Sequence, residues 1–270
     1  MHNAITEYAR RANATVVISA GNIYVTKGKA ETYPCIIAHT DTVHPPIPDR
    51  DFSVRSYQGI FYGWDRRWHR QVGCGGDDKV GIFLALDALR HLPAVKAAFF
   101  RDEEVGCLGS LVADLTFFDD VEFVLQFDRR GYGEIVTRIG NTELCGEDFL
   151  NELRPLLKRH DWQEVNGLLT DVLALKERGL AVSAVNIACG YYRPHTDGEY
   201  VVIDDVRRVR HVMYEMIDVL AGRRWSHHVT YGGREHPRSS CWVQGGVERR
   251  NDLSTMPYSR HTRTLLHKNW

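Results

Sequence analysis

Short apolar segments alternate with helical patterns along most of the chain, and this alternation constrains the fold more than any other feature. The apolar runs are rich in Val, Ile and Phe and end near Gly, Asp or His, which is typical of buried strands. Between several of these runs lie segments whose apolar residues recur at helical spacing on one side. Strands that alternate with helices predict an α/β sheet with helices on its faces. The expected strands are residues 15–19, 23–26, 35–38, 97–100, 123–127, 135–137 and 185–188, and the expected helices are residues 80–91, 147–158, 170–178 and 204–220.

Charge is distributed unevenly along the 270 residues. The net charge is -1, but the segment 222–270 contains nine Lys and Arg against three Asp and Glu, whereas the segment 1–221 contains 25 against 32. An acidic body concentrates cations around it. The basic tail has no nucleic-acid recognition motif, so we expect no nucleic acid as a partner.

The cysteines and the N-terminal segment indicate the cellular compartment of the protein. Six cysteines are scattered without a CxxC pair, which favours reduced thiols and a cytoplasmic location over disulfides or a zinc ribbon. The segment 1–17 has the pattern of an amphipathic helix that leads into a strand, without the apolar core of a signal peptide. No run reaches the roughly 18 apolar residues that span a bilayer, so we expect no membrane partner.

Polar residues gather immediately after several of the strand-like runs. In α/β sheets, ligands bind at the carboxyl ends of the strands. One edge of the predicted sheet would therefore collect two imidazoles and several carboxylates. These residues are His39 and Asp41 after one run, Glu103 and Glu104 after the next, Asp128, and His195.

Each of these motifs alone also has an ordinary structural interpretation. A histidine after a strand is more often a surface or satisfied core residue. The aspartates of GCGGDDKVG, Asp77 and Asp78, suit the N-terminus of the following helix as capping residues, and a Glu pair suits a solvated loop. The whole set, in this order and at strand ends, favours a metal site instead. A carboxylate can bridge two cations, and oxygen ligands with two imidazoles suit zinc, which cobalt or manganese could replace.

Five separated motifs together resemble the dinuclear zinc exopeptidase family that includes peptidase T, the aminoacylases and glutamate carboxypeptidase, with related single-domain aminopeptidases. The resemblance covers about residues 33–220. It implies a mixed, mostly parallel central sheet flanked by helices, forming a single catalytic domain. The motifs are HTDTVHPP, GGDDKVGIFLALDAL, FFRDEEVGCLGS, FVLQFDRRG and NIACGYYRPHTDGEY.

The resemblance also implies a role for each site residue. His39 and Asp128 would bind one zinc ion, Glu104 and His195 would bind the other, and Asp77 would bridge them. Glu103 would be the general base, and Asp41 would orient His39 without binding metal. The peptide bond between the paired aspartates is commonly cis in this family, so we expect a cis bond between Asp77 and Asp78.

One departure from the family concerns the lid or dimerisation domain. Peptidase T and the aminoacylases have this domain inserted between the positions that match Asp128 and His195, and the interval between them in this sequence is too short to hold it. We therefore expect the lid to be reduced to residues 144–180, with two helices. The predicted organisation is a catalytic domain at residues 1–221 and a basic tail at residues 222–270. Without the usual dimerisation element, the oligomeric state is left open.

These observations predict a metal-dependent hydrolase that cleaves an amide bond of a small peptide. An N-acyl amino acid deacylase would use the same chemistry and has the same sequence signature. A metal-binding or interaction protein that has lost catalysis is a further alternative. The presence of Glu103, the expected base, favours an enzyme over that alternative.

Overall fold

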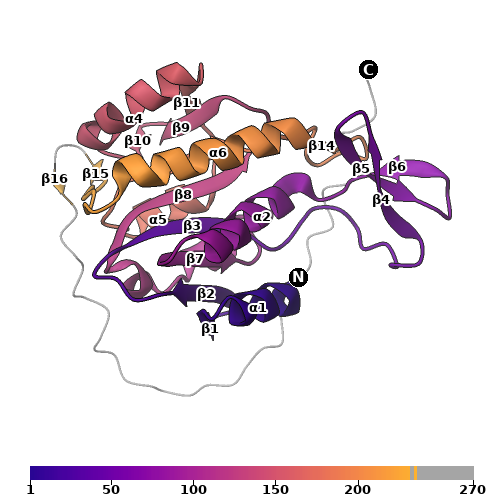
Figure 1. Cartoon of the computed structure of the whole chain (residues 1–270), viewed down its shortest axis with the longest axis horizontal. Coiled ribbons are helices and arrows are strands. Elements are labelled where there is room, and N and C mark those ends of the chain that lie inside the picture. The colour runs from indigo at the N-terminus through magenta and orange to yellow at the C-terminus, as the bar shows by residue number, and fades with distance from the viewer. Residues whose placement is uncertain (232–233, 236–270) are drawn as a thin grey trace, which may run out of the picture. The chain divides into compact units, whose positions relative to one another are not determined.

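The computed structural model has a central sheet built from the predicted strands, covered by helices (Figure 1). The structure describes residues 1–231 and 234–235. Within these residues the sheet has nine strands in the order β1-β2-β7-β3-β8-β12-β9-β10, with β11 paired to β9. The strands are β1 (Thr15–Ser19), β2 (Asn22–Lys27), β3 (Tyr33–His39), β7 (Val95–Phe100), β8 (Val121–Arg129), β9 (Glu134–Ile139), β10 (Thr142–Glu143), β11 (Gln163–Gly167) and β12 (Ala184–Ala188).

The four central strands run parallel, and antiparallel strands flank them. β7, β3, β8 and β12 pair in parallel, whereas β1, β2 and β10 pair antiparallel to their neighbours. The prediction of a mixed, mostly parallel central sheet is therefore confirmed. Because the parallel strands share one direction, their carboxyl ends meet at one edge of the sheet.

The helices cover both faces of this sheet. α1, α2, α4 and α6 contribute to one hydrophobic cluster, and α5 contributes to a second cluster on the opposite face. The helices are α1 (His2–Arg11), α2 (Gly76–His91), α3 (Leu108–Leu111), α4 (Glu147–Arg159), α5 (Asp171–Glu177) and α6 (Ile203–Leu220), and a short 3-10 helix, η1 (Leu115–Phe118), follows α3.

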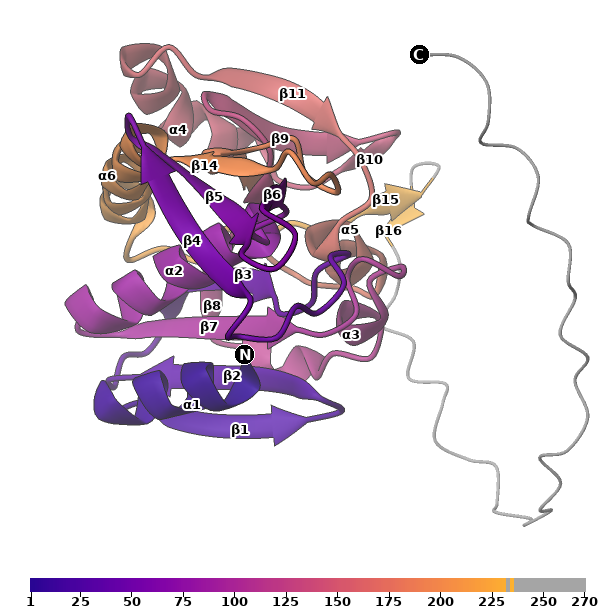
Figure 2. The same cartoon turned by 90° about the vertical axis from the view of Figure 1, so that its right-hand side faces the viewer.

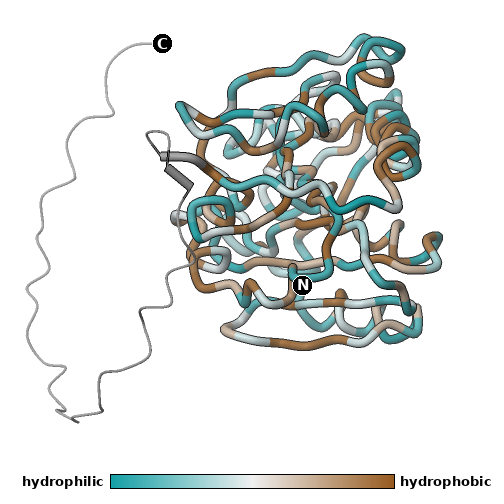
Figure 3. Tube along the Cα trace, turned by 90° about the vertical axis from the view of Figure 1, so that its left-hand side faces the viewer, coloured by the Kyte–Doolittle hydropathy of each residue, from teal (hydrophilic) through white to brown (hydrophobic). Residues whose placement is uncertain are grey.

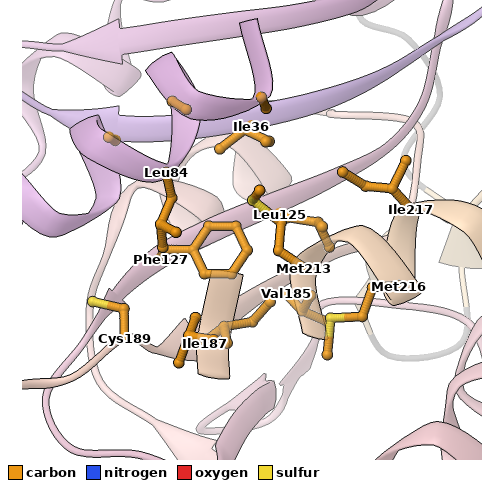
Figure 4. Packing of buried hydrophobic residues seen from close by; sticks show 14 of the residues in the cluster. Ile36, Leu84, Leu125, Phe127, Val185, Ile187, Cys189, Met213, Met216 and Ile217 are labelled. Carbon is orange, nitrogen blue, oxygen red and sulfur yellow. The ribbon is translucent and has the colours of Figure 1, made fainter. Parts of the chain in front are cut away.

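Successive residues of a central strand face the two clusters in turn. In β3, Ile36 packs in the first cluster and Ile37 in the second, as expected where side chains alternate across a sheet. Figure 4 shows Leu84 of α2 and Met213 of α6 gathered with Phe127 of β8 in the first cluster. Hydrophobic stretches accordingly recur along the chain between hydrophilic ones (Figure 3).

A second, smaller sheet was not predicted from the sequence. It joins residues 52–72 to a hairpin near residue 195, in the order β13-β14-β5-β4 with β6 paired to β5. Figure 2 shows β4 and β5 beside β14. Its strands are short and mostly half exposed, so they lack a continuous apolar signal. They are β4 (Phe52–Tyr57), β5 (Ile60–Asp65), β6 (Arg70–Val72), β13 (Tyr191–Tyr192) and β14 (Tyr200–Val202).

The segment 144–180 contains the two predicted helices, α4 and α5, and also the unpredicted strand β11. Since β11 pairs with β9, this segment is part of the main sheet. The first residues of the basic tail also pack on the body: Trp225 is buried, and its amide donates to the carbonyl of Glu122. Two short strands follow, β15 (Thr230–Tyr231) and β16 (Arg234–Glu235).

The division at residue 222 stays a prediction, and residues 232–233 and 236–270 of the tail lie outside the described residues. Across the described part of the chain, no helix has both the length and the apolarity to cross a membrane.

Candidate metal centre

The polar residues singled out from the sequence come together at the carboxyl edge of the central strands. His39 is the last residue of β3, and Asp128 lies near the end of β8. Glu103 and Glu104 follow β7, and His195 follows β13. These segments are distant in sequence, and the parallel pairing of β7, β3 and β8 brings the first three of them together.

Asp77 lies between the two histidines. Its Oδ1 is 3.0 Å from Nε2 of His39, and its Oδ2 is 3.3 Å from Nε2 of His195. Nε2 of His39 also lies 3.5 Å from Oδ1 of Asp128, and Nε2 of His195 lies 2.9 Å from Oε2 of Glu104. The residues thus form two groups that share the Asp77 carboxylate.

These separations are close to those between ligands of one metal ion. Tetrahedral coordination with bonds of about 2.0–2.1 Å places neighbouring ligand atoms about 3.3 Å apart. Within the described residues, one buried oxygen of Glu104, Oε1, has no hydrogen-bond partner, although buried carboxylate oxygens normally have one. The donor types and the spacing therefore fit divalent cations.

The two aspartates of the GGDD turn have different surroundings. In the part of the chain that the structure describes, two groups of potential ligands have ligand atoms within 4.8 Å of one another, namely His39 with Asp77 and Glu104, and His39 with Asp78 and Asp128. Both Asp78 oxygens already accept backbone amides, from His39 at 3.2 Å and from Gly81 at 2.9 Å. Asp77 has its oxygens directed at the two imidazoles instead, so it is the better ligand. The bond between the two aspartates is cis, as predicted.

Asp41 holds the turn that carries the two glutamates. Its Oδ1 accepts the amide of Glu103 at 3.0 Å, and its Oδ2 accepts the amide of Glu104 at 3.1 Å. The same Oδ1 lies 3.4 Å from Nδ1 of His39. This nitrogen has no hydrogen-bond partner within the described residues, so Asp41 is hydrogen-bonded to the turn of the glutamates and only close to the far nitrogen of His39.

Side chains that the sequence analysis did not single out surround Asp128. Its Oδ2 accepts hydrogen bonds from Gln126 at 3.1 Å and Thr170 at 3.0 Å, and its Oδ1 accepts one from Tyr191 at 3.2 Å. The amide of Asp128 donates to Asn186 in the neighbouring strand at 2.9 Å. The carboxylate is therefore fixed from three elements. Gln126, Asn186 and Tyr191 lie within the quoted motifs, but nothing in the motifs indicates that these side chains contact Asp128.

Glu199 was also missed, although it lies in the same motif as His195. Its side chain is fully buried. Its Oε2 accepts the amide of Gly75 at 2.6 Å and pairs with Nε2 of His44 at 2.9 Å, and its Oε1 accepts the amide of Asp77 at 3.1 Å. Its place shortly after His195 was the available signal, but burial cannot be inferred from that spacing.

Three solved structures place this arrangement among known folds. Aminopeptidase PepT from Bacillus cereus is 13% identical with a TM-score of 0.63, over 81% of this chain and 92% of its own. A tripeptidase from Staphylococcus aureus has the same values. The TET1 peptidase of Pyrococcus horikoshii, which can assemble into a tetrahedron or a large octahedral shell, is 14% identical with a TM-score of 0.54, over 82% and 92%.

This chain has the fold of these peptidases. The fold expected from the resemblance is therefore confirmed. At such low identity the likeness concerns the fold, and the chemistry rests on the site residues. No family model and no curated protein matches the sequence.

Negative charge exceeds positive charge in this centre. Burial, followed by the charge of Asp128, raises the pKa of Glu103 to about 8. Burial, followed by the charge of Asp77, raises the pKa of Glu104 to about 7. Burial by itself lowers the pKa of His39, but Asp128 and the other carboxylates raise it well above its ordinary value. Crowded carboxylates of this kind gain most from a bound cation, which favours their ionised forms.

Two of the nine described non-glycine residues with positive φ angles belong to the site segments. They are His195 and Asp102, with φ angles of 62° and 54°, a region that residues other than glycine seldom adopt. Such conformations cluster at functional sites, where the surrounding structure holds them. One places a potential ligand, and the other immediately precedes Glu103.

A pocket of about 430 Å³ is lined by segments that flank the site residues in the sequence. Its wall contains the loop after β3, including Thr42 and His44, and the turn before α2, including Gly75. Trp68, in the turn between β5 and β6, and Arg70 of β6 also line it. This volume lies within the range of small-molecule sites, but none of the seven residues singled out from the sequence lines the pocket.

Proposed function

We propose that this chain is a dinuclear zinc-dependent exopeptidase that removes an amino acid from the end of a small peptide. The observation that carries the proposal is the placement of Asp77, whose two oxygens face different histidines at 3.0 and 3.3 Å. A carboxylate in this position can bind one cation with each oxygen. The peptidase fold supports the same reaction class, and a pocket of small-molecule size is lined by segments that flank these residues in the sequence.

The donor sets suit zinc. His39, Asp128 and one oxygen of Asp77 would hold one ion, and His195, Glu104 and the other oxygen of Asp77 would hold the second. Three protein ligands leave a position open for water or substrate, which is typical of catalytic zinc sites. Cobalt or manganese could occupy the same ligands.

Glu103 would act as the general base. When bound, two such cations lower the pKa of a water molecule and polarise the carbonyl of the scissile bond. Glu103 lies beside the proposed ligand Glu104 but has no ligand role, and burial holds its pKa at about 8. Nearby cations lower this pKa, so the carboxylate can take a proton at neutral pH and pass it to the departing amine.

The neighbours' names support peptides as the substrate class, since they include an aminopeptidase and a tripeptidase. An N-acyl amino acid deacylase is the alternative, because it cleaves the same bond type. A catalytically inactive metal-binding protein would retain the ligands without turnover. The three possibilities differ in what the purified protein hydrolyses.

The test is hydrolysis by zinc-loaded protein of three matched panels: dipeptides and tripeptides with a free N-terminus, the same peptides N-acetylated, and N-acyl amino acids. We expect amino acids to be released from the first panel, and mass spectrometry detects them. Glu103→Gln should lower kcat by about 10²- to 10⁴-fold with unchanged zinc content. Glu143→Gln is the matched control, because Glu143 is exposed on β10.

Cleavage of the N-acyl amino acids alone would favour the deacylase. Absence of turnover on every panel, with Glu103→Gln indistinguishable from the parent chain, would refute an enzymatic role.

A further inference from the structure

Glu199 is a buried carboxylate that accepts hydrogen bonds from three directions. It has no exposed surface, and its partners are the amides of Gly75 and Asp77 and the imidazole of His44, at 2.6, 3.1 and 2.9 Å. A carboxylate removed from water is strongly destabilising unless such donors compensate. Each oxygen of this buried carboxylate thus accepts at least one hydrogen bond.

These contacts connect three segments of the metal centre. His44 belongs to the loop after β3, Gly75 and Asp77 belong to the start of α2, and Glu199 belongs to the segment between β13 and β14 that also carries His195. The amide of Glu199 donates to the carbonyl of Thr196 at 3.1 Å, which closes a turn directly after His195. Glu199 therefore links the segment that carries His195 to the turn that carries Asp77, through its backbone amide on one side and its carboxylate on the other.

The amides that Glu199 binds lie in the turn before the regular part of helix α2. Gly75 has a positive φ of 64°, and Asp77 and Asp78 have non-helical backbone angles, so the regular helix begins after Asp78. Asp78 caps that helix itself, because its Oδ1 accepts the amide of Gly81 at 2.9 Å. Glu199, which lies 122 positions from Asp77 in the sequence, instead accepts the amide of the residue whose carboxylate faces both histidines.

The position of His44 depends on the absence of a side chain at residue 73. A Cβ atom on Gly73 would lie 2.0 Å from the His44 ring, so any larger residue would displace the imidazole. Because His44 also lines the pocket, it lies between that pocket and Glu199. The local sequence thus leaves room for this particular donor.

We propose that Glu199, supported by His44, is a positioning residue that sets the orientation of Asp77 between the two cations. The inference rests on the proposed dinuclear site, but it concerns metal affinity and not turnover. Glu199 touches neither proposed cation. It acts through the amide of Asp77 and through the segment that carries His195.

The experiment compares metal binding by the full-length parent chain, Glu199→Gln and a matched control. Groups that orient metal ligands typically contribute about 10- to 100-fold to affinity, so we expect Glu199→Gln to weaken Zn²⁺ binding by about 10- to 100-fold. Isothermal titration with Zn²⁺ gives affinity and stoichiometry, and the visible spectrum of the Co²⁺-loaded protein reports ligand geometry. A structural defect alone would lower the melting temperature without changing either readout.

Glu122→Gln is the control for burial and charge. Glu122 is also buried, and it accepts hydrogen bonds from Thr32 at 2.7 Å and from the amide of Gly222 at 3.2 Å. It lies at the opposite end of β8 from Asp128. We expect Glu122→Gln to lower the melting temperature while leaving zinc affinity and the cobalt spectrum unchanged.

His44→Ala provides a second variant in case Glu199→Gln does not fold. It removes one donor but keeps the Glu199 charge and both backbone contacts, so we expect a loss of affinity of about tenfold. If both variants bind Zn²⁺ as tightly as the parent chain, the positioning role is wrong while the proposed function stands. If the parent chain binds two cations but cleaves no substrate, the proposed function fails and the positioning role is retained.

Discussion

Replacing the central carboxylate tests the dinuclear site most directly. In Asp77→Asn the side chain keeps its size, but one of the two oxygens becomes an amide NH₂, which cannot bind a cation. In the parent chain the two carboxylate oxygens of Asp77 face Nε2 of His39 at 3.0 Å and Nε2 of His195 at 3.3 Å. One cation position therefore loses a ligand atom, and both lose the shared negative charge.

The size of the effect follows from charge and distance. Two unit charges about 4 Å apart interact by about 4 kcal/mol at an effective dielectric constant of about 20. Since about 1.4 kcal/mol is a factor of ten, the deprived position should lose about three orders of magnitude in affinity. We expect the stoichiometry at micromolar Zn²⁺ to fall from two ions to one.

The assay is metal analysis after equilibrium dialysis, supported by isothermal titration. Asp197→Asn is the matched control, because Asp197 is exposed, pairs with Arg70 at 3.1 Å and lies close to His195 in the sequence. It removes the same charge near the centre and should leave two ions bound. Two tightly bound ions in Asp77→Asn would refute the bridging role, and one ion in the parent chain would refute the dinuclear site.

Two further predictions concern stability. Metal-free protein should become less stable as pH rises from about 5 to 8, because the raised pKa of Glu103, about 8 against an ordinary 4.5, means that the folded chain holds more protons than the unfolded chain in this window. Thermal melts in the presence of chelator measure how stability changes with pH. Glu103→Gln should reduce the slope of stability against pH. An unchanged slope in this variant would contradict the pKa argument. Trp225→Ala should lower the free energy of unfolding by about 3–5 kcal/mol, because Trp225 is buried and packs edge-on against Phe149 at 5.6 Å. Urea denaturation measures the change in the free energy of unfolding. Trp68→Ala is the control, because Trp68 is exposed. Equal effects of the two changes would contradict the packing of Trp225 on the body.

The sequence predicted the main sheet because its signals are local. A buried central strand such as β3 contains a continuous apolar run, CIIA at residues 35–38, and a long helix such as α6 has a repeating apolar side, so both could be located from a few consecutive residues. The strands of the second sheet lack such a run: β4 has the half-exposed sequence FSVRSY. Their pairing depends on contacts between residues 60 and 202, which no local pattern contains.

The candidate site divides in the same way. His39, Glu104 and His195 could be proposed because each follows a strand within a recognisable motif. The partners that fix them could not, because Thr170 meets Asp128 across 42 positions and Glu199 meets Asp77 across 122. These contacts depend on the folded geometry of several elements at once.

The origin of the proposed ligands in five separate segments has a consequence for folding. The cation held by Asp77 and His195 would close a loop between residues 118 positions apart in the sequence. The entropic cost of closing so long a loop is large in the unfolded chain and small once the chain has folded. An unfolded chain would therefore bind zinc weakly, whereas the finished sheet presents the ligands together. Metal would therefore bind after the sheet has formed. Much of the binding free energy would then add to the free energy of unfolding of the domain.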